Sequence, residues 1–150
     1  MNIDEYNKLA ESLKPKNPYL KNAIMAFLFG GLIGMIGQGI YALYMDIFNM
    51  ESESAAALMS VTIVFIASVL TGLGIYDKIA KYAGAGTFIP ITGFANSMTS
   101  AALEAKSEGL VLGIGSNMFK LGGTVITFGI VSSVLLGVMR YVFLYVQSFF

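Results

Sequence analysis

The stretch YAGAGTFIPITGFANSMTSAAL, from Tyr82 to Leu103, decides the fold of this chain. It carries no formal charge, yet glycines, a proline and many hydroxyl or amide side chains interrupt it. Pro90 lacks an N–H and its ring clashes with the preceding turn, so it frees backbone groups. At membrane depth such groups must be met by protein or by cavity water. We therefore expect a broken or re-entrant segment here.

Two uncharged apolar runs precede this segment, and two follow it. Asn22 to Met45 and Ser54 to Tyr76 are each long enough as helices to cross about 30 Å of hydrocarbon. Gly109 to Phe119 is too short to cross and is expected to form half of a span. Leu121 to Met139, which Lys120 separates from that run, is expected to form the final helix. The predicted fold is an all-α polytopic membrane protein with two N-terminal spans, a broken third segment and a C-terminal span, roughly three to five crossings in all.

The composition is typical of a membrane protein. Of 150 residues, 56% are apolar and 12% are charged, about half the charged fraction of soluble domains. Nine basic residues balance nine acidic ones, so no positive face for nucleic acid is expected. The chain has no His and no Cys, which removes the usual zinc, haem and nucleophile chemistry. We expect no enzymatic activity, no cofactor and no metal site.

The charges at the ends of the first two spans predict their orientation. Lysines lie before the first span and after the second, whereas the loop between them is acidic, which predicts a cytoplasmic N-terminus. Residues 1–21 are expected to form a separate segment, with a short interfacial helix or a flexible tail before a break at Pro15 to Pro18. Residues 22–150 form the membrane domain. Ser52 or Ser54 is expected to cap the second span.

Small residues recur at four-residue steps along the apolar runs. Such stripes let transmembrane helices approach closely, within or between subunits. A pore or hinge role for the glycines is the less common alternative. The residues expected to pack helices in this way, with the amide that ends the first stripe, are Ala26, Gly30, Gly34, Gln38, Gly109, Gly113, Gly129, Ser133 and Gly137.

The interrupted segment supplies the candidates for a polar path. Uncharged donors and acceptors on irregular backbone suit a conducting or substrate-holding path in a bilayer. The same side chains also bond back to their own helix or bridge neighbouring helices, and the two roles are about equally expected. The path-lining candidates are Thr87, Pro90, Thr92, Gly93, Asn96, Ser97, Thr99 and Ser100.

Four further residues are candidates for a mouth or gate: Glu104, Glu108, Asn117 and Lys120. Glu104 and Glu108 lie four residues apart and, on one helix face, would attract a hard cation such as calcium. A solvated loop is the more common arrangement for such a pair. Lys120 either extends its amine to the interface or contacts an anion.

Four stretches resemble one known family. They are KPKNPYLKNAIMAFLFGGLIGMIGQGI from Lys14, TGLGIYDKIAKYAGAG from Thr71, PITGFANSMTSAALEAKSEG from Pro90 and SNMFKLGG from Ser116. With them, residues 14–140 are similar to the membrane subunits of the SpoVA family of endospore-forming bacteria. The YAGAG and PITGF stretches are shared with the paralogous AE-type subunit. The N-terminal extension and ANSMTSAALEAKSEG favour the AC type.

The resemblance implies a channel subunit for dipicolinic acid, with its calcium, in the inner spore (forespore) membrane. It implies passage inward during sporulation and outward at germination, and opening under membrane tension. The implied partners are the AE-type membrane subunit and the soluble thiolase-like AD subunit, in an oligomer surrounded by lipid. A non-conducting structural adaptor of the same complex and a small secondary transporter are the alternatives. A transporter is disfavoured because the acidic residues sit at the ends of uncharged runs.

Overall fold

The computed structural model describes residues 2–13 and 18–148, and every regular element within them is a helix. Three of these helices are long and apolar enough to cross a membrane, namely α2, α3 and the continuous helix from Leu110 to Gln147. The predicted all-α membrane fold is confirmed. The elements are α1 (Ile3–Leu13), α2 (Tyr19–Asp46), α3 (Ser52–Gly72), α4 (Tyr76–Ala83), α5 (Ala85–Phe88), α6 (Ile91–Glu104), the 3-10 turn η1 (Lys106–Glu108), the π-helix η2 (Leu110–Gly115) and α7 (Ser116–Gln147).

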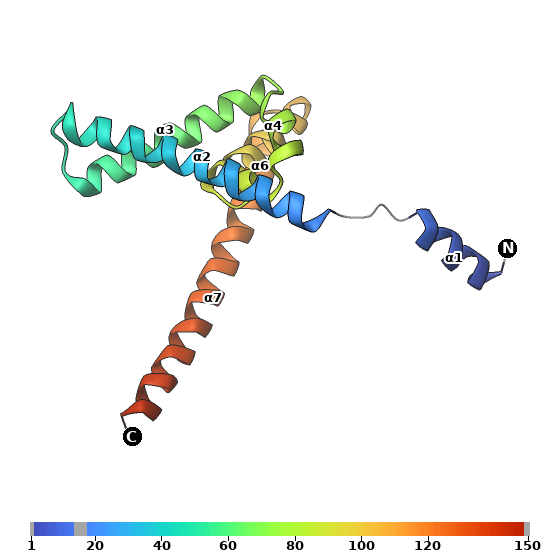
Figure 1. The fold of residues 1–150 in the computed structure, drawn as a ribbon. Helices are drawn as coiled ribbons and strands as arrows, with labels where there is room; N and C mark the ends of the chain where they lie inside the picture. Colours follow the sequence, from blue (N-terminus) through green and yellow to red (C-terminus); the bar gives the residue numbers. More distant parts are fainter. Residues whose placement is uncertain (1, 14–17, 149–150) are drawn as a thin grey trace.

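The two N-terminal spans, α2 and α3, form an antiparallel hairpin (Figure 1). They approach closely at Gly37, where an added Cβ would lie 3.1 Å from Cδ1 of Ile63. Nearer the loop, the Tyr44 hydroxyl lies 2.8 Å from the Thr62 hydroxyl oxygen. Because Gly37 has no side chain, the side chains of Ile63 and Met59 of α3 pack against the backbone of α2 there, and the Tyr44 hydroxyl joins the two helices nearer the loop.

The prediction that Ser52 or Ser54 caps α3 is wrong. Glu51 occupies the N-cap position in an extended conformation and makes no side-chain cap bond. Ser52 is already the first helical residue, and its hydroxyl oxygen lies 2.9 Å from the hydroxyl oxygen of Tyr41. The serine therefore ties α3 to α2 instead of closing its own helix end.

Replacing Tyr44 by phenylalanine tests this hairpin lock. The change removes the partly buried hydroxyl pair with Thr62 and is expected to lower the free energy of unfolding by about 1 kcal/mol. Thermal unfolding of the purified chain in detergent measures the loss. Tyr19→Phe, at an exposed position on the same helix, is the matched control. Equal melting of both variants would mean that the hydroxyl pair adds nothing to hairpin stability.

The expected broken segment, Tyr82 to Leu103, holds the end of α4, all of α5 and most of α6. Helix α3 ends at Gly72, before the predicted end of the second span at Tyr76, and α4 begins at Tyr76. Helices α4, α5 and α6 together are called the broken segment below. Gly84 separates α4 from α5 with a φ of +52°, a backbone conformation that residues with a Cβ rarely adopt. Pro90 separates α5 from α6 in an extended conformation, as expected from its missing N–H. The segment folds against α2 and α3, and Ala67, Tyr76 and Ala95 form the core where α3, α4 and α6 meet.

The sequence prediction for the C-terminal part was wrong in one respect. Gly109–Phe119 is not half of a span, because η2 and α7 form one continuous helix from Leu110 to Gln147 with Lys120 inside it. Lysine is a good helix former, and an exposed lysine on a helix surface interrupts nothing. The Lys120 side chain is exposed, and its carbonyl accepts a hydrogen bond from the Thr124 hydroxyl at 2.7 Å.

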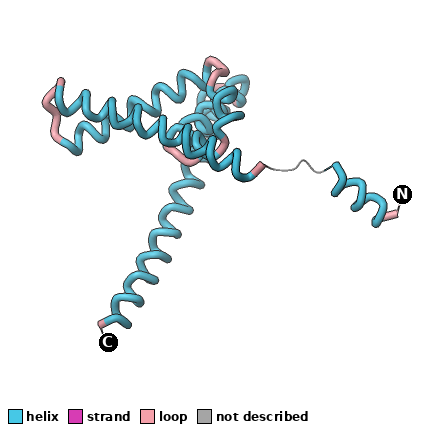
Figure 2. The backbone as a smooth tube through the Cα atoms, in the orientation of Figure 1, coloured by secondary structure: helices cyan, strands magenta, loops and turns pink. Residues whose placement is uncertain are grey.

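Helix α7 runs away from the hairpin instead of alongside it (Figures 1 and 2). Its contacts are with α6 and η2, and no residue of α7 is buried. Near the N-terminus, Ile3–Leu13 form the helix α1, and its position at the membrane interface stays a prediction. Residues 14–17, where part of the proline break was expected, lie outside the described residues.

Candidate functional site

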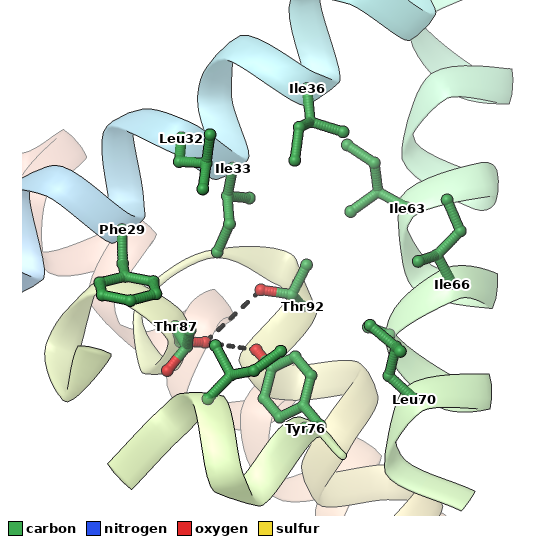
Figure 3. Close-up of a pocket in the computed structure, with 12 residues that line it drawn as sticks. Phe29, Leu32, Ile33, Ile36, Ile63, Ile66, Leu70, Tyr76, Thr87 and Thr92 are labelled. Atoms are coloured by element: carbon green, nitrogen blue, oxygen red, sulfur yellow. Dashed lines mark hydrogen bonds between the residues drawn. The ribbon is translucent and has the colours of Figure 1, made fainter. Parts of the chain in front are cut away.

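The helix break at Pro90 leaves the last carbonyls of α5 without their usual helical donors, and the carbonyl of Thr87 is one of them. In an unbroken helix the N–H of Ile91 would donate to the carbonyl of Thr87, but Ile91 begins the next helix. The Tyr76 hydroxyl donates to this carbonyl at 2.8 Å, and the Thr92 hydroxyl lies 3.5 Å from it (Figure 3). All three residues are buried. The backbone group freed by the break is therefore met by protein, chiefly by the phenol of Tyr76.

A second polar contact joins the broken segment to α3. The Thr71 hydroxyl lies 2.8 Å from Oδ1 of Asn96 and donates to the carbonyl of Ala67 at 2.7 Å. A hydroxyl has one proton, so it serves both contacts at once only when the Asn96 amide is rotated and its nitrogen donates to the Thr71 oxygen. Asn96 is half-buried, which leaves part of its amide free to face a cavity.

Backbone-to-backbone contact holds α5 against α2. A Cβ on Gly86 would press on the carbonyl oxygen of Ala26 and lie 2.9 Å from the Gly30 nitrogen, and both contacts are closer than real Cβ atoms show. A Cβ on Gly30 would instead lie at an ordinary 3.6 Å from Gly86. Gly86 is therefore the tight partner in this crossing, and it fixes the position of the neighbouring Thr87.

Two cavities meet at Tyr76 and Thr87, which line both. The first, here called the apolar cavity, measures about 270 Å³ and lies between α2, α3 and the broken segment (Figure 3). The second, here called the Asn96 cavity, measures about 400 Å³ and lies among α4, α5 and α6. The Tyr76–Thr87 hydrogen bond thus stands in the wall between them. The hydrocarbon wall of the apolar cavity comes from Phe29, Leu32, Ile33 and Ile36 of α2 and Ile63, Ile66 and Leu70 of α3.

The structure brings only part of the predicted path together. Thr87, Gly93 and Asn96 line the Asn96 cavity, while Thr92 lines the apolar cavity. The Ser97 hydroxyl donates back to the carbonyl of Gly93 at 3.0 Å. Three other candidates line neither cavity: Pro90, Thr99 and Ser100.

The mouth and gate candidates lie apart from both cavities. Glu104 ends α6 and Glu108 ends η1, so the two exposed carboxylates stand on different helices. Asn117 donates from Nδ2 to the carbonyl of Gly113 at 3.1 Å. Lys120 points outward from α7. Among residues 2–13 and 18–148, no group of three acidic side chains gathers where a metal could bind.

The predicted packing stripes have mixed placements. Ala26 and Gly30 contact Gly86, and Gly113 packs against Ala105 and Glu108. A Cβ would find open space at four other glycines of these stripes: Gly34, Gly109, Gly129 and Gly137. Gln38 and Ser133 are exposed, and the Ser133 hydroxyl donates back to the carbonyl of Gly129 at 2.8 Å.

Sequence reasoning missed Tyr76 and Gly86 as functional residues. Tyr76 stood only at the end of the second expected span, and Gly86 only in the YAGAG stretch. A signal for Tyr76 was present, because a carbonyl freed by Pro90 requires a donor and a tyrosine lies in the adjacent short segment. Nothing in the sequence indicated that Gly86 would meet the backbone of α2.

Comparison with known proteins identifies the family. The model of the SpoVAC/SpoVAEB sporulation membrane proteins matches residues 22–139. The chain belongs to this family. It is also 50% identical to stage V sporulation protein AC of Bacillus subtilis (strain 168) over 143 residues, which cover 95% of each chain. No solved structure matches it.

Family membership settles the broad role. The SpoVAC/SpoVAEB proteins are sporulation membrane proteins and not a known enzyme family. This family member therefore has a role in sporulation, and its three apolar helices make it a multi-pass membrane protein. The resemblance deduced from the quoted motifs is confirmed at the level of the family.

Proposed function

We propose that this chain is a channel subunit that passes dipicolinate with calcium across the inner spore membrane and opens under membrane tension. The observation that carries the proposal is the wall between the two cavities. There a buried tyrosine hydroxyl and a backbone carbonyl freed by Pro90 close one face of the Asn96 cavity. A gated subunit needs a path that is closed at rest and opens when a contact breaks. Here that contact is the hydrogen bond between Tyr76 and Thr87.

The lining of the Asn96 cavity suits the chemistry of the cargo. The Asn96 amide offers N–H groups, which suit the carboxylates of dipicolinate. Gly84 and Gly93 line the cavity without side chains, and their carbonyls accept hydrogen bonds from the Thr87 and Ser97 hydroxyls. The cavity of about 400 Å³ lies within the range of small-molecule sites, about 300–1,000 Å³. These features support a path for calcium dipicolinate, a small ion pair without net charge.

Tyr76 and Thr87 form the gate in this proposal. In the closed state the phenol of Tyr76 satisfies the Thr87 carbonyl. In the open state cavity water takes over that carbonyl, so opening exposes no unpaired group. Membrane tension acts on the gate where Gly86 of α5 contacts Ala26 and Gly30 of α2. When tension separates these helices, Gly86 moves, and the adjacent Thr87 moves with it.

The placement of the acidic residues argues against a secondary transporter. Coupling to protons or sodium normally uses a carboxylate inside a span. Asp46 ends α2, Asp77 lies in the first turn of α4, and Glu104 ends α6. Among the described residues, no carboxylate lies in the middle of α2, α3 or α7. A channel or a non-conducting adaptor is therefore favoured over a coupled carrier.

Reconstitution separates the channel from the adaptor. The full chain is placed in vesicles with and without the paralogous AE-type subunit. Calcium dipicolinate release and single-channel current are then recorded while tension is raised. Discrete tension-dependent openings are expected. Silence in every combination, with correct insertion verified, would support the adaptor, and flux that requires an ion gradient would support a transporter.

Asn96→Leu is expected to reduce dipicolinate release strongly while leaving insertion intact. The change removes the polar amide from the Asn96 cavity and from its contact with Thr71. Ser100→Leu, on the exposed side of the same helix, is the matched control and should release at the normal rate. Release is measured by terbium–dipicolinate fluorescence in the same vesicles. Normal release by Asn96→Leu would remove this cavity from the path.

The same proposal covers location and assembly. We infer that residues 1–21 lie on the core side, since lysines lie before the first span and after the second, whereas the loop between the spans is acidic. We also infer an oligomer with the AE-type membrane subunit, and recruitment of the thiolase-like AD subunit. Helix α7, none of whose residues is buried, supplies the surface available for such assembly.

A further inference from the structure

We propose that the apolar cavity binds one acyl chain of a membrane phospholipid. The proposal concerns a binding site beside the path and does not depend on whether the chain conducts. Its basis is the chemistry of the cavity wall, the position of its mouth, and its size.

The wall offers almost nothing to water or to a charged cargo. Aliphatic and aromatic side chains from α2 and α3 form most of it. The hydroxyls of Tyr76 and Thr92 point to the Thr87 carbonyl (Figure 3), and the Thr87 hydroxyl donates to the carbonyl of Gly84 at 3.1 Å. A buried water needs two to four polar partners, whereas apolar cavities of about 150 Å³ stay dry and take up hydrocarbon guests. A volume of about 270 Å³ therefore suits a hydrocarbon occupant.

The mouth of the cavity opens to the faces of the spans that lipid covers. Leu32 and Ile36 of α2 and Ile66 of α3 line the cavity and are also 47%, 51% and 42% exposed. The inner wall, by contrast, is buried, with Ile63 at 8% and Ala67 at 2%. A chain can thus enter from the bilayer between α2 and α3 and reach buried atoms.

Photolabelling tests the site directly. The full chain is placed in nanodiscs that contain a graded fraction of phospholipid with a diazirine in one acyl chain. After illumination, the adducts are mapped by mass spectrometry. Adducts on the buried Ile63 and Ala67 are expected to saturate as the fraction rises. Adducts on Phe65, an exposed position on the same helix, are expected to rise in proportion to it.

Two tryptophan variants on adjacent residues provide the matched comparison. Ile66→Trp fills the mouth and is expected to abolish the saturable adducts on Ile63 and Ala67, while Phe65→Trp leaves them unchanged. Ile33→Trp, from the α2 wall, makes the same test if Ile66→Trp does not fold. The proposal is overturned if adducts at the buried positions are absent, rise linearly, or persist in the filled variants. Saturable labelling by a free fatty acid only, or crosslinks to a second protein copy at these residues, would overturn it too.

Discussion

Replacing Gly86 by alanine is expected to lower the free energy of unfolding by about 3 kcal/mol, the upper end of what overpacking usually costs. The added Cβ would press on the backbone of α2 at Ala26 and Gly30. Backbone cannot rotate away as a flexible side chain can, so α5 must shift and carry Thr87 with it. Thermal unfolding of the purified chain in detergent measures the loss. Accumulation in the membrane gives a second readout.

The control for Gly86→Ala is Gly34→Ala on α2, the helix that α5 crosses. A Cβ at Gly34 meets nothing within 4 Å, and alanine is the better helix former by about 1 kcal/mol. Gly34→Ala should therefore melt at or above the wild-type temperature. If Gly86→Ala also melts normally, α5 does not rest on α2, and the route by which tension is proposed to reach Thr87 disappears.

Tyr76→Phe is expected to raise the resting release of dipicolinate from reconstituted vesicles about tenfold. The ring remains, but the buried Thr87 carbonyl keeps only the Thr92 hydroxyl at 3.5 Å. An unsatisfied buried acceptor costs about 1–3 kcal/mol, and each 1.4 kcal/mol changes an equilibrium about tenfold. Because water can satisfy the carbonyl in the open state only, the cost falls on the closed state. The tension needed for opening should fall accordingly.

Tyr82→Phe is the matched control for the gate. It removes a hydroxyl from the same helix, α4, at a side chain that is 67% exposed. Its release and its opening tension should equal those of the wild type. Equal release by Tyr76→Phe and Tyr82→Phe would show that the Tyr76 hydroxyl stabilises the fold without holding a gate. Unfolding measured on both proteins separates that outcome from simple loss of structure.

The N-terminal half was predictable because charge and helix geometry alone decide it. The uncharged runs bounded by Lys21, Asp46, Glu53 and Asp77 gave two spans, and the structure has α2 and α3 there. Pro90 was sufficient to predict a break, since a residue without an N–H interrupts a helix anywhere beyond its first turn. These features depend on local chemistry, which one sequence displays in full.

The C-terminal half was misjudged because one charge was treated as a boundary. Lys120 divides two apolar runs in the sequence but lies within one helix in the structure. The cost of a lysine depends on depth, and a long side chain near a helix end extends its amine to the interface. Depth is set by the rest of the fold, so the sequence could not supply it.

The sequence predicted which segment holds the candidate site, but not how the side chains of the site are arranged. Both roles foreseen for the polar side chains occur, since Ser97 bonds back to its own helix while Asn96 reaches Thr71. Tyr76 and Thr87, the pair that forms the proposed gate, lie on either side of Gly84. The chain changes direction at this glycine, and the pattern of apolar residues does not predict the new direction. Tertiary geometry alone brings the phenol to the freed carbonyl.

The π-helix η2 has a consequence for how α7 is aimed. A π turn holds one residue more than an α turn, and each residue of an α-helix advances it by about 100°. The extra residue between Leu110 and Gly115 therefore rotates all the following side chains of α7 about the helix axis. This offset decides which face of α7 packs against Met98, at Gly122. It also decides which faces of α7 remain exposed to neighbouring molecules. A chain one residue shorter at that point would keep its hydropathy profile and yet present a different face to its surroundings.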